Sequence, residues 1–498
     1  MTDRYPPILP LLPLMLWRTP PGLELILAQE GVPFARLKEA HRLAFRGGRF
    51  VLFDGRTTAP SSLSGLLAAD QVAIDVDALR TGEPSDPFAA LVDHRAARAA
   101  WRIGPWTLTE RVARQPKAWV RRRLIGKLRR AVTRAGGVWI RLAPFPYPYR
   151  SAFSFRVDLD EPLAEDYHRF AAARAPLAEC CTHFVSTHAY THHASVWRDL
   201  RHYDTQSHGH FHHVYRAPES NRLNLERAHR ILHGFGFEPL GFAGPHGRWC
   251  RSLDDALEEM GYLYSSDFQL GYDDLPFFPW KGERFSKVLQ VPVHPVCEGL
   301  FLEAGVAEPG IIAEYLGQLV AARLDAGELA IAYGHPERRL GRMPEVLDRL
   351  ARTVAGQTLV WRVTFSELAR WWRWRAARRW LVFPRQENRL EIQFDEWDPQ
   401  FDLALEIHRG PFHCAVPVTG PRLSLSLAGL AYQRGASLEP ILGPPEIDPG
   451  SISLKSAVKS AIDWETVTPL AEIPRSSLSN RVKRGLRWWQ LQRARAST

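Results

Sequence analysis

Cysteine is scarce in this sequence, and the most familiar serine-hydrolase signature is absent. The 498 residues include five cysteines, with Cys180 and Cys181 adjacent and no C-x-x-C spacing. An odd number without paired spacing argues against a disulfide framework and is typical of proteins in a reducing compartment. No G-x-S-x-G occurs, so no activated serine of that kind is indicated.

A long apolar segment is also lacking. The amino terminus, MTDRYPPILPLLPLMLW, contains a short apolar run that four prolines interrupt and that no convincing cleavage site follows. Such a run is too short to span a bilayer and does not read as a signal peptide. With 45% apolar and 24% charged residues, the chain is predicted to be globular and longer than one ordinary domain. We expect a cytoplasmic protein, free or bound peripherally to the inner face of the membrane.

Acidic and imidazole side chains form the most informative pattern. SAFSFRVDLD predicts a buried strand, and Asp158 and Asp160, two residues apart, share one of its faces. Gly209 suits a tight turn after HYDTQS that lets His208 and His212 converge on one ion. Two imidazoles and one carboxylate leave positions open for water on Zn²⁺ or a similar ion, and the second carboxylate can reach that water. Without a cation, two carboxylates this close would not both stay ionised.

Residues 150–375 resemble the polysaccharide deacetylases, which are carbohydrate esterase family four and are also called the NodB-homology domain. Segments similar to the five motifs of that family occur in the family's order: SFRVDLDEP, SHGHFHH, FAGPHGRW, YSSDF and AIAYGHPE. VWRVTFSELARWW is similar to the stretch that closes the domain. The resemblance implies a distorted, incomplete (β/α) barrel with its site at the carboxyl ends of the strands. Alternating strand-like and helix-like patterns also indicate an α/β barrel.

The resemblance implies a role for the residues of each motif. It makes Asp158 the catalytic base and His335 the general acid, and it makes Asp267 the residue that orients His335, although Asp267 could instead cap a turn. The metal ligands that it implies for Zn²⁺, or for another divalent metal such as Co²⁺ or Ni²⁺, are Asp160, His208 and His212. The candidate substrate-binding residues in the third motif are Pro245, His246, Gly247, Arg248 and Trp249.

The third motif departs from the family at one position. Ala243 stands where the family has an arginine that pairs with the base aspartate, and Arg156 and Arg248 are the two candidates to replace that arginine. The departure weakens the case for a chitin-type substrate more than the case for hydrolysis. A second H-x-x-x-H, formed by His188 and His192, follows the first motif too soon and lacks the S-H-G turn, so we do not assign it to the metal.

These parts predict the hydrolysis of an N-acyl sugar. A Zn²⁺-bound water has a pKa near about 7, and Asp158 would take its proton during attack on the amide carbonyl. The metal and a backbone N–H would stabilise the oxyanion, and His335 would protonate the departing amine. The expected substrate is an N-acetylated or N-formylated sugar in a polysaccharide or lipid-linked glycan of envelope or exopolysaccharide biosynthesis. The alternatives are an amidase of the same fold that acts on a small C–N substrate such as a ureide, and an inactive glycan-binding scaffold.

Composition divides the chain into four parts. Residues 1–145, which include GLELILAQEGV and RFVLFDG, predict a small accessory α/β domain, and LAPFPYPYR predicts a linker into a catalytic domain at 146–378. Residues 379–470 contain alternating segments such as RLEIQFDEW and RLSLSLAGLAY, which predict a β-rich module. That module could bind substrate or serve as a packing cap. Residues 471–498 form a basic tail that contains tryptophan.

The net charge of +10 is concentrated in three basic segments that contain tryptophan, at 117–134, 370–380 and 481–495. Basic amphipathic segments with tryptophan are attracted to anionic membrane surfaces. The alternative is that they are solvated helices whose aromatic side chains pack inward. We expect no nucleic-acid partner, because no nucleic-acid-binding module is recognisable.

Overall fold

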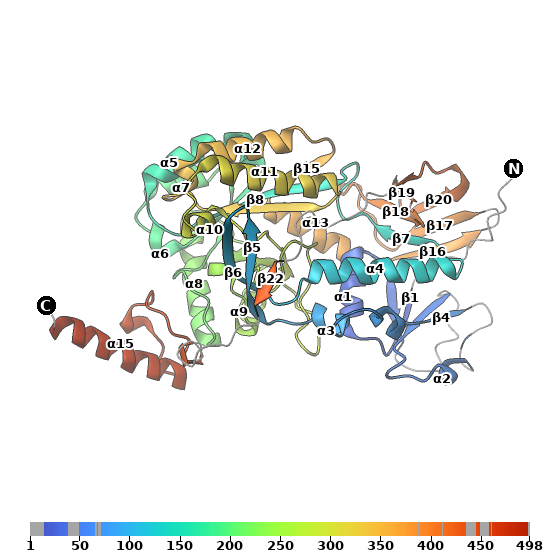
Figure 1. Ribbon diagram of the computed structural model, residues 1–498, viewed down its shortest axis with the longest axis horizontal. Helices are drawn as coiled ribbons and strands as arrows, with labels where there is room; N and C mark the ends of the chain where they lie inside the picture. The colour runs from blue at the N-terminus through green and yellow to red at the C-terminus, as the bar shows by residue number, and fades with distance from the viewer. Residues whose placement is uncertain are drawn as a thin grey trace.

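The structure is a computed structural model (Figure 1). It describes residues 14–37, 49–64, 67, 71–385, 388–410, 412–434, 445–448, 458–459 and 461–496. Residues 1–13 of the apolar amino terminus lie outside the described residues, as do 435–444 and 449–457 of the predicted β-rich module. The remainder of the apolar terminus, Leu14–Trp17, forms the buried strand β1.

The amino-terminal region contains a small parallel sheet. Its strands, in the spatial order β2-β1-β3-β4, are β2 (Phe34–Arg36), β1, β3 (Phe50–Phe53) and β4 (Val72–Asp75). Helix α1 (Pro21–Glu30) connects β1 to β2 and ends at Gly31, whose φ of 67° is the left-handed conformation that glycine adopts at a helix end. The short helices α2 (Pro60–Ser64) and α3 (Pro87–Leu91) complete this part. This small α/β unit agrees with the predicted fold class.

A β-hairpin follows and lies against the central part of the molecule. Its strands are β5 (Ala96–Ile103) and β6 (Trp106–Ala113), and β5 also pairs with the distant strand β22 (Glu446–Asp448). The backbone N–H of Ala113 donates to the carbonyl of Phe268 at 3.0 Å, which joins the hairpin to the central sheet region. Helix α4 (Lys117–Arg134) follows the hairpin.

The central sheet has eight strands, and every pairing in it is parallel. The path runs β13-β12-β11-β10-β9-β8-β14, and β15 pairs with the first residues of β8. The strands are β8 (Ser151–Leu159), β9 (Cys181–Val185), β10 (Asp204–Ser207), β11 (Gly241–Ala243), β12 (Tyr264–Ser266), β13 (Leu289–Gln290), β14 (Leu329–Gly334) and β15 (Val360–Arg362). Because β13 and β14 do not pair, the barrel is incomplete, and a hydrogen bond from the N–H of His294 to the carbonyl of Ile331 (3.0 Å) bridges the gap.

Helices connect these strands and surround the sheet (Figure 1). They are α5 (Ala164–Ala173), α6 (Thr187–Tyr190), α7 (Ala194–Leu200), α8 (Pro218–Gly234), α9 (Arg251–Glu259), α10 (Glu298–Glu303), α11 (Pro309–Asp325), α12 (Pro344–Ala355) and α13 (Phe365–Ala377). All nine residues of β8 are buried, as expected for a central strand of a parallel sheet that is covered on both faces. The predicted incomplete (β/α) barrel is confirmed.

Two antiparallel sheets lie beyond α13, in agreement with the predicted β-rich module. One contains β16 (Trp380–Arg385), β17 (Arg389–Phe394) and β20 (Arg422–Ser426), and the other contains β7 (Trp139–Leu142), β18 (Ala404–Arg409), β19 (Phe412–Pro417) and β21 (Gln433–Arg434). Two pairings cross the predicted domain boundaries, since β7 pairs with β18 and β5 pairs with β22. Residues that we assigned to the accessory domain therefore complete sheets with residues of the β-rich module.

The last described element is helix α15 (Leu478–Ala496). It extends from one end of the molecule near α8 (Figure 1). No helix in the described ranges is both long enough and apolar enough to cross a membrane.

Candidate active site

The candidate site lies at the carboxyl ends of the parallel strands. Asp160 follows β8, His208 follows β10, Asp267 follows β12 and His335 follows β14. Neighbouring parallel strands end at the same edge of a sheet, so these distant residues meet there. A cavity of 120 Å³ lies at this edge. The residues that line it are Glu110, Arg156, Asp158, Asp160, His208, His212, His246, Gly247, Phe268, Cys297, Gly299, Leu300, Glu303, Tyr333, His335 and Arg339.

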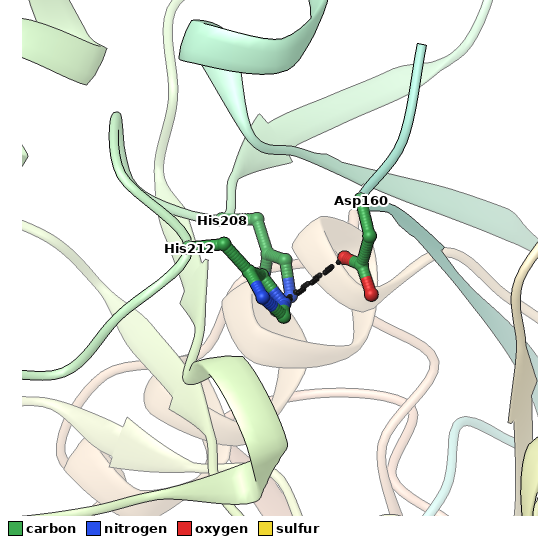
Figure 2. A group of neighbouring side chains, drawn as sticks. All are labelled: Asp160, His208 and His212. Atoms are coloured by element: carbon green, nitrogen blue, oxygen red, sulfur yellow. Dashed lines mark hydrogen bonds and ion pairs between the residues drawn. The ribbon is translucent and has the colours of Figure 1, made fainter. Parts of the chain in front are cut away.

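Asp160, His208 and His212 converge on one point (Figure 2). Oδ1 of Asp160 lies 3.3 Å from Nε2 of His208 and 3.2 Å from Nε2 of His212, and the two imidazole nitrogens are 3.2 Å apart. His208 is fixed by its other nitrogen, since Nδ1 donates to the carbonyl of Ala243 at 2.7 Å. That bond leaves the lone pair of Nε2 facing the carboxylate, as in histidines that bind metal.

The donor set fits a divalent cation. Oδ1 of Asp160 is buried without a hydrogen-bond partner, which is costly for a carboxylate unless a cation compensates it. Burial raises the pKa of Asp160, but the positive charge that His212 and His208 carry when protonated outweighs it and holds the pKa well below its ordinary value. An ionised carboxylate and two imidazoles are a ligand set suited to Zn²⁺, Co²⁺ or Ni²⁺.

Asp158 is held by an arginine of its own strand. Nε and Nη2 of Arg156 donate to the two carboxylate oxygens of Asp158 at 2.7 and 2.6 Å, and Nη1 donates to the carbonyl of Ser266 at 2.8 Å. Burial raises the pKa of Asp158, but Arg156 and His208 lower it below its ordinary value. Arg156 and Arg248 were the candidates to replace the arginine that the third motif lacks at Ala243. In the structure Arg156 contacts Asp158.

His335 contacts a different carboxylate from the one that we predicted. Oε1 of Glu298 accepts from Nδ1 of His335 at 2.7 Å and from its backbone N–H at 2.9 Å, and Glu298 is completely buried. Nε2 of His335 faces Asp160, 3.6 Å from its Oδ2. Burial lowers the pKa of His335, but Glu298 and a hydrogen bond with Cys297 raise it well above its ordinary value. The ring is therefore fixed at Nδ1, and Nε2 faces the cavity.

Asp267, which we expected either to orient His335 or to cap a turn, has other partners than His335 in the structure. Asp267 accepts from the N–H of Gly244 at 2.8 Å and from the hydroxyl of Ser265, so it ties the end of β12 to the end of β11. Burial raises its pKa to about 7, against the hydrogen bond from Ser265. The carboxylate that contacts His335 is that of Glu298, the first residue of α10. No sequence spacing indicates that Glu298 is the partner of His335.

A second group of possible metal ligands is better described as a hydrogen-bond network. Ligand atoms of Cys297, Glu298 and His335 lie within 4.8 Å of one another. However, Nη1 of Arg339 lies 2.7 Å from Nδ1 of His335 and 3.7 Å from Oε1 of Glu298. The guanidinium already compensates the carboxylate, so a second cation there would meet a positive charge.

The third motif contributes two of its five candidate residues to the cavity. His246 and Gly247 line it, whereas Pro245, Arg248 and Trp249 do not. His246 has a φ of 56°, a strained conformation that persists at functional sites, and its ring lies 5.0 Å from that of His212. Burial, followed by His212, lowers the pKa of His246 to about 4, so its imidazole is neutral near pH 7.

The pair that we set aside lies apart from the metal group. The ring of His188 packs against the rings of His210 and Phe211, each at 5.2 Å. Neither His188 nor His192 belongs to a group of potential ligands among the described residues. Sequence reasoning also missed Glu110, which reaches the cavity from β6, outside the predicted catalytic domain. Its position depends on the packing of the hairpin and has no local signature.

Fold and site together define an incomplete parallel α/β barrel with an Asp–His–His group at its carboxyl edge. No family model and no curated protein matches the chain. Solved structures similar to it include a putative polysaccharide deacetylase from Mycobacterium smegmatis, with 20% identity over 49% of this chain and 98% of that one and a TM-score of 0.40. Another is Puue allantoinase, with 22% identity, 47% and 94% coverage and a TM-score of 0.37. A third is a family 4 carbohydrate esterase from Streptomyces lividans, with 14% identity, 43% and 91% coverage and a TM-score of 0.31.

Proposed function

We propose that the chain is a metal-dependent hydrolase that removes an acetyl or formyl group from the nitrogen of a sugar. One arrangement supports this proposal above all. A group of three potential metal ligands lies between a carboxylate held by an arginine and an imidazole held by a glutamate, around one cavity. The pKa of Asp158 is lowered and that of His335 is raised, which favours an ionised carboxylate as the base and a protonated imidazole as the acid.

Each group has a definite part in the proposed reaction. Asp160, His208 and His212 would hold Zn²⁺, or Co²⁺ or Ni²⁺, which supplies Lewis acidity for the carbonyl and lowers the pKa of water. Asp158, oriented by Nε and Nη2 of Arg156, accepts the proton of the attacking water. His335 donates the proton on Nε2 to the departing amine, because Nδ1–H donates a hydrogen bond to Glu298, which fixes the ring.

The substrate that we propose is a polysaccharide or a lipid-linked glycan of envelope or exopolysaccharide biosynthesis. The cavity is small, which favours a short acyl group. We also propose that the protein acts in the cytoplasm. All five cysteines are free, four of them buried, as suits a reducing compartment.

Metal analysis combined with amine release tests the proposal. The panel contains N-acetylglucosamine oligomers, an N-formylated lipid-linked sugar and allantoin. Asp160→Ala should lose both bound metal and turnover, whereas Asp158→Asn should keep the metal and lose about 10²–10⁴-fold in rate. His188→Ala is the matched control for the histidine ligands and should keep both.

Other outcomes would replace the proposal. Ring opening of allantoin to a carboxylate, without release of amine from either sugar, would make the protein a ureide amidase. Glycan binding without bound metal or turnover would make it a scaffold. Loss of metal from Asp158→Asn, with retention in Asp160→Asn, would exchange the roles of the two aspartates.

A further inference from the structure

Helix α15 has an unusual orientation relative to the protein that it packs on. Its inward residues are polar or charged: Asn480 and Lys483 are buried, and Arg484 and Arg487 are partly buried. Lys483 lies 3.5 Å from a carboxylate oxygen of Glu465. A helix that docks on a globular protein normally presents its apolar stripe to that protein.

The apolar stripe of α15 faces solvent instead. Leu478, Val482, Leu486 and Trp489 follow one another at spacings of four, four and three residues, which places them on one side of the helix. Their exposed fractions are 77%, 41%, 42% and 48%. At 100° per residue this stripe lies opposite the inward polar face.

The charge of α15 indicates what covers this stripe. Between Leu478 and Ala496 there are six basic residues and no acidic one. Arg481 and Arg493 are exposed, and the guanidinium of Arg493 lies 4.0 Å from the ring centroid of Trp489. A helix with an apolar stripe flanked by arginine and tryptophan is the kind that lies in the interface of an anionic bilayer.

The base of α15 is fixed to the loop that carries two of the proposed metal ligands. Asp463, which lies 3.8 Å from Lys483, accepts from the backbone N–H of Arg216 at 2.8 Å and contacts Nε2 of His213 at 3.3 Å. In addition, the hydroxyls of Tyr215 and Thr468 are hydrogen-bonded. Residues 213–216 directly follow His212, so these contacts tie α15 to the loop that carries His208 and His212.

We propose that the outward stripe of α15 docks the protein on an anionic lipid surface and holds the cavity close to that surface. The use of such docking rests on the proposed function, because it would bring a lipid-linked sugar to the site. The docking itself is a property of α15 and does not depend on turnover.

Sedimentation with vesicles of phosphatidylglycerol and phosphatidylcholine tests the docking. The full chain should bind anionic vesicles, and Leu486→Ser with Trp489→Ser should weaken binding about tenfold or more, because buried apolar surface is lost. Salt should weaken binding without abolishing it, since screening acts within a Debye length of about 10 Å at 0.1 M but does not affect apolar contacts. Surface substitutions are preferable to deletion of α15, which would leave Asp463 and Glu465 without Lys483.

Phe412→Ser is the matched control, because Phe412 on β19 is 46% exposed and lies outside α15. It should bind vesicles like the unaltered chain. Amine release from a soluble sugar and metal content should be unchanged in the α15 variant, so a failure of docking is distinguishable from a failure of the proposed function.

Equal binding of the unaltered chain and the α15 variant would overturn the proposal, as would equal binding to anionic and neutral vesicles. A monomer–dimer equilibrium that the α15 variant abolishes, without binding of the chain to vesicles, would assign the stripe to a second copy of this chain. Sedimentation velocity without lipid detects that case.

Discussion

Helices α13 and α15 have similar compositions and opposite packing. Both are rich in arginine and tryptophan and contain adjacent tryptophans. In α13, Trp371 and Trp372 are each 2% exposed. In α15, Trp488 and Trp489 are 56% and 48% exposed, and a lysine is buried on the opposite side. In α13 the aromatic side chains pack inward, which was one of the two alternatives for the basic segments. In α15 they face solvent.

The partners of each helix explain the difference. α13 lies against the core, where Arg375 donates to the carbonyls of Ala143, Gln29 and Leu142 and its guanidinium lies 4.5 Å from the ring centroid of Trp372. The surface beneath α15 presents carboxylates, so the side chain that fits there is a lysine. Composition therefore identifies an amphipathic basic helix, and the surface that it meets determines which face is buried.

Replacing a tryptophan should produce the largest difference in the free energy of unfolding between the two helices. Trp372→Ala should lower the free energy of unfolding by about 3–5 kcal/mol, because it leaves a cavity in the core. Trp488→Ala should change it by less than about 0.5 kcal/mol, because the side chain is exposed. Urea denaturation of the two variants measures both. Equal shifts of the midpoint would contradict the packing described for one of the helices.

A second comparison concerns the arginines. Arg375→Met should cost about 2–3 kcal/mol, because it leaves buried carbonyls without a donor. Arg481→Met, on the exposed side of α15, should stay within about 0.5 kcal/mol. Denaturation midpoints again provide the measurement. A neutral Arg375→Met would mean that water replaces the guanidinium.

A smaller and local effect is expected for the buried lysine of α15. Lys483→Met should destabilise the docking of α15 by about 1–2 kcal/mol, since the partner carboxylates stay buried but their ion pairs are long. Hydrogen exchange of the amides in α15 should speed up, while exchange in α13 should not. Adding Asp463→Asn should restore part of the loss, which a purely steric effect of methionine would not allow.

The smallest effect should appear with pH. Burial raises the pKa of Asp463, but its contacts with His213 and Lys483 lower it below its ordinary value. The carboxyl thus binds a proton less readily when α15 is docked. Its stabilisation is complete above a pH of about 4 and is lost as pH falls through the lowered pKa. Amide exchange at decreasing pH should release α15 before α13, whose Arg375 contacts carbonyls that do not titrate. Simultaneous release would indicate that the carboxylates at the first turn of α13, Asp204 and Glu367, lose their hydrogen bonds at the same pH.

The sequence was most informative where function depends on local spacing. The positions of Asp160, His208 and His212 beside strand ends follow from short segments, and the structure brings their ligand atoms together. Glu298 could not be predicted as the partner of His335, because α10 and β14 meet only through tertiary packing. The pairings of β7 with β18 and of β5 with β22 were missed for the same reason, since strand partners distant in sequence have no local signature.

The pairing of β5 with β22 also bears on how the protein is made. The two strands are separated by about 350 residues of chain, and β5 forms a hairpin with β6, which carries Glu110 into the cavity. At about 5–20 residues per second, a ribosome needs about 20–70 s to synthesise that stretch. During this time the outer edge of β5 has no partner, so the nascent chain exposes an open strand edge, which other chains or a chaperone can bind. This wall of the cavity is complete only after residue 448 has emerged.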